Sequence, residues 1–298
     1  MRIRELLTTG RPSFSFEFFP PKDEAGFAQL HEALAWLREL RPTYVSVTYP
    51  SRIDMRPRTL DLVTRLRAEY GLEAMAHVTC GGATRGEVLR VLEILAESGV
   101  DNVLALRGDP PAGEAAFTPH PEGFAHACEL AAFSRKYFRF CLGGACYPEK
   151  HVEAPSLEVD LGHLKRKVEA GCEYLITQLF FDNQKYFDFV ARVRSAGIGV
   201  PIIPGIMPIT NVNQIERFTK MCGATIPEPL LSELRRLRDD HHAVLSLGVA
   251  HATAQCLELL HRGAPGIHFY TLNKSPATRT ILTALRTVYP PAQQPAGS

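Results

Sequence analysis

Hydrophobic positions along this 298-residue chain follow two alternating patterns. Short runs rich in β-branched and aromatic residues predict buried strands. The longer segments between them place apolar residues three and four positions apart, which is the spacing of a helix with one buried face. The predicted strands are Ser13–Phe19, Tyr44–Tyr49, Glu73–Thr79, Asn102–Arg107, Phe138–Cys146, Tyr174–Phe180, Val200–Met207 and Gly266–Leu272.

Helices are predicted between these strands. One of them has clear boundary signals, because Thr84 is a suitable N-cap, Glu87 stands three residues later as in a capping box, and Gly99 follows the last turn. The predicted helices are Glu24–Leu40, Arg58–Tyr70, Arg85–Ser98, Pro121–Tyr137, Leu157–Ala170, Gln184–Ala196 and Val212–Met221.

The order of these elements predicts the fold. Strict alternation of strand and helix favours a parallel sheet, and eight repeats in a chain of this length fit a closed (β/α)8 TIM barrel better than an open sheet. Two extra helices, Glu228–Arg238 and Ala243–Arg262, are expected before the last strand. Because no shift in composition marks a boundary, we expect one barrel domain over residues 1–289 and a disordered tail over 290–298.

Composition narrows the class of protein. Lys and Arg number 33 and Asp and Glu 32, so the formal net charge of +1 argues against nucleic acid or a membrane as the main partner. The seven cysteines form no C-x-x-C pair, and no metal site is predicted. The N-terminus lacks a signal peptide, and prolines interrupt the most apolar segment, so no membrane span is expected. These features are typical of a soluble cytoplasmic protein.

Glu17, in the first strand, is the first candidate for chemistry, because the active site of a parallel barrel lies at the carboxyl ends of its strands. Alternation puts Glu17 on the same face as Ser13 and Ser15, opposite Phe16 and Phe18. Apolar neighbours favour the neutral carboxylic acid, which suits a general acid. The alternative is a Glu paired with an Arg or Lys across the barrel.

Two further strand ends carry polar residues. The fourth ends in Arg107-Gly108-Asp109, which supplies a cation, a close approach of backbone to a ligand, and a carboxylate. The alternative is a simple turn. His77, near the end of the third strand, is a candidate ligand contact or a hydrogen-bonded core residue.

The fifth strand and the helix after it add more candidates. Tyr147 and His151 could stack on or hydrogen-bond a flat cofactor, or fix a proline turn. Asp160, His163 and Lys167 lie three and four residues apart and therefore share one helix face. That face is either solvated or binds a phosphate or an adenine-ribose group.

Gln178 stands in an apolar strand, where an unbonded amide is costly, so we expect it to meet a ligand or a polar neighbour. Several standard motifs are absent: the sequence has no G-x-G-x-x-G, no P-loop, no H-E-x-x-H and no G-x-S-x-G.

Six strand-end motifs together resemble the methylenetetrahydrofolate reductase family. Each is weak alone, but their order and spacing are specific, and the match extends from Ser13 to about Leu285. The motifs are Ser15-Phe16-Glu17-Phe18-Phe19-Pro20-Pro21, Ala105-Leu106-Arg107-Gly108-Asp109, Ala145-Cys146-Tyr147-Pro148-Glu149, Ile176-Thr177-Gln178, Pro204-Gly205-Ile206-Met207-Pro208 and His268-Phe269-Tyr270-Thr271-Leu272-Asn273. The resemblance implies a flavin-bearing (β/α)8 barrel of the short, bacterial, catalytic-only type.

The resemblance also implies an activity. It is the FAD-dependent reduction of 5,10-methylenetetrahydrofolate to 5-methyltetrahydrofolate, with NADH or NADPH as co-substrate in a ping-pong mechanism that feeds methionine synthesis. Glu17 would be the general acid, and Asp109 would modulate the flavin. Relatives form homo-oligomers, so a dimer or tetramer is expected.

The family's binding residues are carried over by motif. FAD would contact Thr48, His77, Arg107, Gly108, Asp109, Ala125, Tyr147, His151, Asp160, His163, Arg166 and Lys167. Folate would contact Glu17, Gln178, Gln214, Phe218, Tyr270 and Lys274, with Gln178 also meeting the nicotinamide.

Three positions depart from the family pattern. Pro50 stands where the family usually has Gly, and the loop Ser51–Pro57 after it is divergent. His163 replaces a more usual Asn. Lys274 replaces the Arg of some members, which keeps the charge and loses bidentate recognition of carboxylates.

Two other functions are compatible with the same residues. One is a non-redox lyase that uses Lys167 or Lys274 as a Schiff-base nucleophile. The other is a folate-binding module without catalysis, which the combination of Glu17 with Arg107-Gly108-Asp109 disfavours. The sequence does not distinguish NADH from NADPH, because it has no Rossmann selector residue.

Overall fold

Parallel strands form one sheet that curves into a barrel. The computed structural model describes residues 1–21, 23–50, 56–110, 116–273 and 276–291. Within them the strand order is β7-β6-β5-β4-β3-β2-β1-β9-β8. The strands are β1 (Ser13–Phe18), β2 (Tyr44–Val47), β3 (Ala74–Thr79), β4 (Asn102–Leu106), β5 (Cys141–Cys146), β6 (Tyr174–Thr177), β7 (Ile202–Ile203), β8 (Gly205–Ile206) and β9 (Gly266–Tyr270).

The two shortest strands are halves of one predicted strand, Val200–Met207, divided at Pro204. β7 pairs with β6 on one side, and β8 pairs with β9 on the other. Pro204 has no N–H to give to a ladder, but its carbonyl accepts a hydrogen bond of 2.9 Å from the backbone N–H of His268. The sheet is therefore nearly closed, and the predicted (β/α)8 barrel is confirmed.

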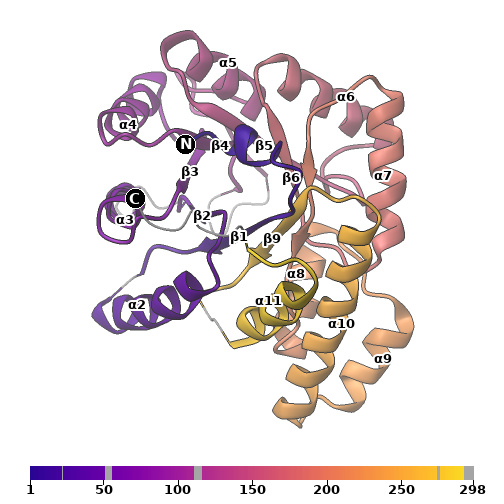
Figure 1. Cartoon of the computed structure of the whole chain (residues 1–298). Coiled ribbons are helices and arrows are strands. Elements are labelled where there is room, and N and C mark those ends of the chain that lie inside the picture. Colours follow the sequence, from indigo (N-terminus) through magenta and orange to yellow (C-terminus); the bar gives the residue numbers. More distant parts are fainter. Residues whose placement is uncertain (22, 51–55, 111–115, 274–275, 292–298) are drawn as a thin grey trace.

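Helices surround the sheet (Figure 1). They are α1 (Ile3–Leu6), α2 (Glu24–Glu39), α3 (Arg56–Ala68), α4 (Arg85–Glu97), α5 (Ala127–Tyr137), α6 (Leu157–Glu169), α7 (Asn183–Ser195), α8 (Val212–Cys222), α9 (Glu228–Arg236), α10 (His241–His261) and α11 (Pro276–Val288). The extra helices α9 and α10 precede the last strand, as predicted, and the capping box of Thr84 and Glu87 is present at α4. The short α1 and the final α11 were not among the predicted helices.

The predicted helix Pro121–Tyr137 is wrong in its first part, because α5 begins only at Ala127. The segment before α5 turns instead, and the N–H of Gly123 donates to the carbonyl of His120. A Cβ atom on Gly123 would lie 2.3 Å from the carbonyl oxygen of Ala83. This close packing against the start of α4 outweighs the helical spacing of the apolar residues.

Strand alternation divides the core into two layers. Phe14, Phe16 and Phe18 of β1 are fully buried in the layer between sheet and helices. A separate cluster fills the inside of the barrel, where Tyr44 and Tyr174 pack with Ile3 of α1. The backbone N–H of Ile3 donates to Asn102 at the first residue of β4, so α1 lies at the amino end of the barrel. Glu17, the fifth of the six residues of β1, lies toward the opposite, carboxyl end.

α10 differs from the expectation that no segment could span a membrane. By length and composition it is long and apolar enough to do so, and it is the one such helix among the described residues. Its apolar residues also pack inside the protein, because Val244, Cys256 and Leu259 are buried, and α10 contacts α11, α7 and β9. A buried core helix passes the same test, so the finding is weak evidence for a membrane helix.

Two helical glycines test the packing of these layers. A Cβ at Gly248 on α10 would lie 1.9 Å from the carbonyl oxygen of Ile209, whereas a Cβ at Gly162 on α6 would have no atom within 4 Å. We expect Gly248→Ala to lower the free energy of unfolding by about 1–3 kcal/mol. Gly162→Ala should raise it by about 0.5–1 kcal/mol. Urea titrations of both variants measure this, and effects of the same sign would contradict it.

Candidate active site

A cleft opens at the carboxyl ends of β4 and β5, against α5 and α6. Its empty space, with the open mouth included, is about 840 Å³. Small and apolar residues of the strand ends, Ala105, Leu106 and Ala145, form one part of the lining. The other part is polar: Arg107, His126, Tyr147, His151, Glu153, Asp160, His163, Arg166 and Lys167.

The cleft brings together many of the residues predicted to hold FAD. The predicted contacts that line it are Arg107, Tyr147, His151, Asp160, His163, Arg166 and Lys167. These residues come from the end of β4, from the loop after β5 and from α6, which are far apart in sequence. The lining combines apolar surface, an aromatic ring and several cations, so it fits an elongated ligand with a flat part and an anionic part.

α6 supplies one wall of this cleft. Its N-cap Ser156 accepts a hydrogen bond from the N–H of Val159, and the helix then places Asp160, His163 and Lys167 on the face toward the cleft, as their spacing predicts. The ammonium group of Lys167 donates to the carbonyl of Ala145 and lies 5.7 Å from the centre of the Tyr147 ring. The helix wall is therefore fastened to the end of β5.

The loop after β5 is held by side chains that bond to its backbone. Asp160 accepts a hydrogen bond of 3.0 Å from the N–H of His151. Nδ1 of His151 in turn accepts one of 3.1 Å from the N–H of Glu153. Burial lowers the pKa of His151, and the positive charge of Arg107 adds to this effect. The neutral ring thus carries its hydrogen on Nε2, from which it can donate to a ligand.

Arg107, which lines the cleft, forms an ion pair with Glu153. Its guanidinium donates two hydrogen bonds to Glu153, of 2.5 and 2.8 Å, and lies 4.5 Å from the centre of the Phe117 ring. The hydrogen bonds from Arg107 hold the pKa of Glu153 below its ordinary value. An anionic ligand group at this position would compete with Glu153 for the same donors.

Gly108 and Asp109 follow Arg107 directly. Gly108 has a φ of +91°, and a Cβ there would lie 3.2 Å from the side chain of Thr79, so this position requires glycine. Asp109 is exposed. It nevertheless lies near Tyr147: burial raises the pKa of that phenol, and the carboxylates of Asp160 and Asp109 add to the rise.

Glu17 forms a second cluster, inside the barrel. Its side chain is buried, with the residue only 8% exposed. Oε2 lies 3.5 Å from Nε2 of His77 and 3.6 Å from Nε2 of His268. Within the described residues these imidazoles are the basic groups at ion-pair distance from Glu17, so the predicted alternative of an Arg or Lys partner is not observed there.

The two histidines differ in their other contacts. Burial lowers the pKa of His77 to about 4, with the nearby His268 acting in the same direction and Glu17 opposing it. His77 is therefore neutral at pH 7. Nδ1 of His268 lies 2.8 Å from the hydroxyl oxygen of Ser15, and the Tyr44 ring stacks on its imidazole at 6.3 Å. Both Nε2 atoms are buried without a hydrogen-bond partner among the described residues, so both can bond to Glu17 or to a ligand.

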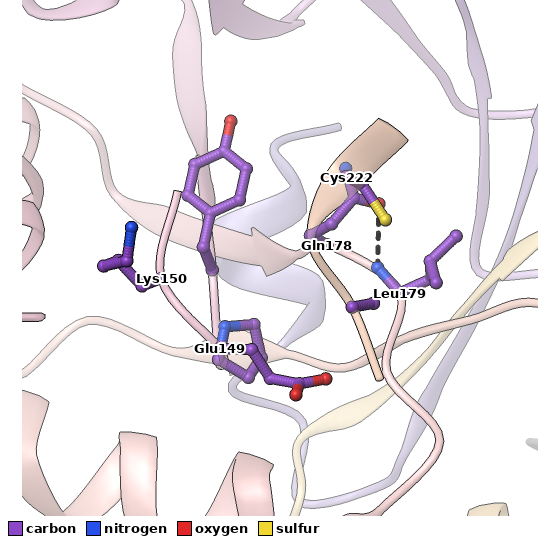
Figure 2. A pocket seen from close by; sticks show the side chains of 8 residues that line it. Glu149, Lys150, Gln178, Leu179 and Cys222 are labelled. Atoms are coloured by element: carbon purple, nitrogen blue, oxygen red, sulfur yellow. Dashed lines mark hydrogen bonds between the residues drawn. The ribbon is translucent and has the colours of Figure 1, made fainter. Parts of the chain in front are cut away.

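Gln178 and Tyr270, predicted folate contacts, lie at the ends of β6 and β9. Oε1 of Gln178 accepts a hydrogen bond of 2.9 Å from the N–H of Leu179, which Figure 2 shows as a dashed line. The hydroxyl of Tyr270 donates to the carbonyl of Thr177 at 2.6 Å, and its ring lies edge-on to His268 at 5.3 Å. Tyr270 thus connects β6 to the Glu17 cluster.

Gln214 and Phe218 both lie on α8, outside the cleft. The backbone N–H of Gln214 donates to the N-cap side chain of Asn211. The Phe218 ring is half-buried against an apolar cluster, with the guanidinium of Arg217 5.3 Å from its centre. Lys274, the last predicted folate contact, lies outside the described residues.

Five predicted FAD contacts do not line the cleft. They are His77, Gly108 and Asp109, whose positions are described above, and Thr48 and Ala125. The N–H of Thr48, after β2, donates to the carbonyl of Phe18. The N–H of Ala125 donates to the side chain of Glu129. The next residue, His126, does line the cleft. Of the divergent loop, residues 51–55 lie outside the described part of the chain.

His268 and Glu153 are site residues that the sequence reasoning did not single out. His268 could have been found, because in Gly266–Tyr270 the polar His alternates with Ile267 and Phe269 and must therefore face inward. Nothing in the sequence pattern marks Glu153. Among the described residues, no group of three His, Cys, Asp or Glu side chains is arranged to hold a metal ion.

The fold and the two clusters define a class. A (β/α)8 barrel with a buried carboxyl group and a cation-lined cleft at the carboxyl ends of its strands has the arrangement of a barrel enzyme. Residues 2–286 match methylenetetrahydrofolate reductase, and the chain belongs to this family.

Relatives of this chain include bacterial and plant proteins. The 5,10-methylenetetrahydrofolate reductases of Salmonella typhimurium and Escherichia coli are each 37% identical to it over 276 residues, covering 93% of this chain and 91% of theirs. The Arabidopsis thaliana "Methylenetetrahydrofolate reductase (NADH) 1" is 36% identical over 297 residues, covering 95% of this chain. The chain spans about half the length of the plant and yeast relatives, between 46% and 50% of each.

Solved structures agree on the fold. A Clostridium thermocellum protein that binds two copies of 5-methyl-5,6,7,8-tetrahydrofolic acid has a TM-score of 0.65 at 17% identity, covering 97% of this chain and 100% of that one. A dihydropteroate synthase of Xanthomonas albilineans has a TM-score of 0.51 at 16% identity, covering 94% and 93%.

The buried state of His77 predicts a pH-dependent stability. Its folded pKa of about 4 lies below the ordinary 6.5, so the unfolded chain takes up this proton first as the pH falls. The free energy of unfolding should therefore fall by about 2 kcal/mol between pH 7 and pH 5 through His77 alone. In urea titrations, His77→Gln should lack this part of the pH dependence, whereas the exposed His261→Gln should keep it. Equal pH dependence in His77→Gln and the unsubstituted protein would refute the assignment.

Proposed function

We propose that this protein reduces 5,10-methylenetetrahydrofolate to 5-methyltetrahydrofolate, with FAD as cofactor and NADH or NADPH as the reductant, in a ping-pong mechanism. The observation that carries the proposal is the pairing of two features at one end of the barrel. Glu17 is a buried carboxyl group near two imidazoles, and the cleft at the ends of β4 and β5 offers cations and an aromatic ring. Membership of the methylenetetrahydrofolate reductase family supports the same conclusion.

The residues of the cleft fit FAD. Arg166 and Lys167 on α6 would face the diphosphate, together with Arg107 once Glu153 releases it. Nε2–H of His151 is the hydrogen-bond donor that the loop leaves for the cofactor. Gly108, which has no side chain, would let the backbone at the end of β4 approach a bound flavin. When bound, the flavin supplies the hydride-transfer chemistry; the protein orients it and provides the proton.

Glu17 would supply that proton. Opening the five-membered ring of the folate turns one of its nitrogens into a leaving amine, which a general acid must protonate. Because Glu17 lies on the inward face of β1, its carboxyl group is inside the barrel. Nε2 of His77, which is neutral at pH 7, lies 3.5 Å from Oε2 of Glu17. After the transfer, an imidazole that carries its hydrogen on Nε2 can donate to the carboxylate and stabilise it.

The lyase alternative receives no support from Lys167. Its ammonium group is bonded to the carbonyl of Ala145 and lies over the Tyr147 ring. A Schiff-base lysine must instead present a neutral amine to a carbonyl carbon. The other lysine considered, Lys274, lies outside the described residues.

Replacing the acid separates the two half-reactions. Glu17→Gln should bind FAD and be reduced by the coenzyme at the rate of the unsubstituted protein. Its oxidation by methylenetetrahydrofolate should slow by about 10²–10⁴-fold, the usual contribution of a general acid. Anaerobic stopped-flow measurements follow each half-reaction, with the exposed Glu39→Gln as a matched control. Folate reduction at the unsubstituted rate in Glu17→Gln would remove Glu17 from this role.

Asp109 gives an electrostatic prediction. A carboxylate near the flavin disfavours the addition of electrons, so Asp109→Asn should raise the flavin reduction potential. Equilibration of the bound flavin with a reference dye measures the potential. Asp239→Asn, which removes an exposed carboxylate after α9, should leave it unchanged. An unchanged or lower potential in Asp109→Asn would contradict the prediction.

A further inference from the structure

Glu149, in the loop after β5, is joined to the segment that follows α8. Its two carboxylate oxygens accept hydrogen bonds from a single residue, Thr225. The backbone N–H of Thr225 lies 3.0 Å from Oε1, and its hydroxyl oxygen lies 2.5 Å from Oε2. We refer to this pair as the 149–225 clasp. It links two segments that are 76 residues apart in the chain.

A second contact lies beside the clasp. α8 is followed by its C-cap Gly223, which adopts a left-handed conformation with a φ of +74°. A Cβ at this glycine would lie 2.8 Å from a methyl group of Val152. The loop after β5, which carries Tyr147, His151 and Val152 and is called the cofactor loop below, therefore packs directly on the end of the helix. One polar and one apolar contact therefore fix the same two segments.

The clasp spans the region where the two proposed ligands would meet. On one side, the loop after β5 carries Tyr147 and His151 of the cofactor cleft. On the other, α8 carries Gln214 and Phe218, which are predicted to contact folate. The small gap between the segments is also lined by Gln178, and Figure 2 shows Glu149, Gln178 and Cys222 around it.

The first part of α8 is anchored by other means. Val212, Ile215 and Thr219 are buried, and Glu216 is paired with Arg235 and Arg238 near α9. None of these contacts reaches the cofactor loop. The 149–225 clasp and the contact between Gly223 and Val152 connect the end of α8 to that loop.

We propose that Glu149 is a positioning residue, and that the 149–225 clasp holds α8 at the distance from the cofactor loop that folate binding requires. This inference rests on the proposed function. In this proposal Glu149 does not touch the substrate. Its side chain acts through Thr225 on α8, the helix that carries Gln214 and Phe218.

Variants of the clasp test the proposal by steady-state kinetics. Thr225→Val removes the hydroxyl donor and should raise KM for methylenetetrahydrofolate by about three- to tenfold, and Glu149→Ala by about tenfold, in line with one or two lost charge-assisted hydrogen bonds. The rate of flavin reduction by the coenzyme should stay within about twofold in both. Thr225→Ser retains both donors and should behave as the unsubstituted protein.

A matched control comes from another exposed pair of the same chemistry. On α9, the hydroxyl of Ser232 donates to the carboxylate of Glu228 at 3.0 Å. Ser232→Ala removes that bond away from the cleft, and it should change neither KM nor flavin reduction.

Cys222 provides a readout that does not depend on activity. It is the last residue of α8, is half-buried, and lines the gap beneath the clasp. Its labelling by a maleimide, followed by peptide mass spectrometry, should accelerate in Thr225→Val and remain unchanged in Thr225→Ser and Ser232→Ala. Cys128, which lines the cofactor cleft, serves as an internal reference.

Thr225→Val is the decisive variant for this labelling. Burial raises the pKa of Cys222, and the negative charge of Glu149 contributes to the rise, so Glu149→Ala would accelerate labelling through charge alone. Thr225→Val leaves that charge in place, and faster labelling then reports a displaced helix end.

The outcomes separate the clasp from the proposed function. Faster Cys222 labelling in Thr225→Val together with a raised KM supports the proposal. Faster labelling in a protein that reduces no folate even when unsubstituted would support the clasp and refute the proposed function. Unchanged labelling and KM in Thr225→Val overturn the clasp. If KM rises in Glu149→Ala while labelling and KM are unchanged in Thr225→Val, Glu149 contacts the substrate directly, and the clasp proposal is also overturned.

Discussion

The inward and outward alternation of β1 is the constraint on which the rest of the structure depends. Phe14, Phe16 and Phe18 are fully buried against the helices, so the residues between them must point into the barrel. A slip of one residue in register would exchange the two sets and bury three aromatic rings where Glu17 now lies. The position of the proposed acid is therefore fixed by hydrophobic packing on the other face of its strand.

The inside of the barrel is also divided along its axis, into an apolar part and a polar part. The amino end is filled by an apolar cluster that includes Tyr44, Tyr174 and Ile3 of α1, and the polar layer of Glu17, His77 and His268 lies above it. Because the cluster below excludes water, burial disfavours charge in this layer, and it lowers the pKa of His77 to about 4. The barrel thus supplies a low-dielectric floor for groups that exchange protons.

The sequence predicted the strands well because their signals are local, and it missed features that depend on distant neighbours. Thr84 and Glu87 sufficed to mark the start of α4. Pro121–Tyr137 has a helical pattern, but its start is shaped by packing on Ala83, which no local spacing reveals. α11 was overlooked although Ile281, Leu282 and Leu285 have helical spacing and are buried. For the site, strand ends indicated Glu17 and Arg107, whereas Glu153 and the bond from His151 to Asp160 arise only when loops meet in space. The roles assigned by resemblance remain predictions.

The charged groups that line the cleft have partners within the protein, which an anionic ligand would have to replace. Arg107 already donates to Glu153, Lys167 to a backbone carbonyl, and Asp160 accepts from the loop backbone. Each of these three charged groups has a partner within the protein, which lowers the electrostatic cost of placing them together in the cleft. An anionic ligand must therefore replace existing partners, and its net binding energy is the difference between the new hydrogen bonds and those it displaces. Affinity in such a site depends on how weakly the internal partners are held as much as on the number of cations that line it.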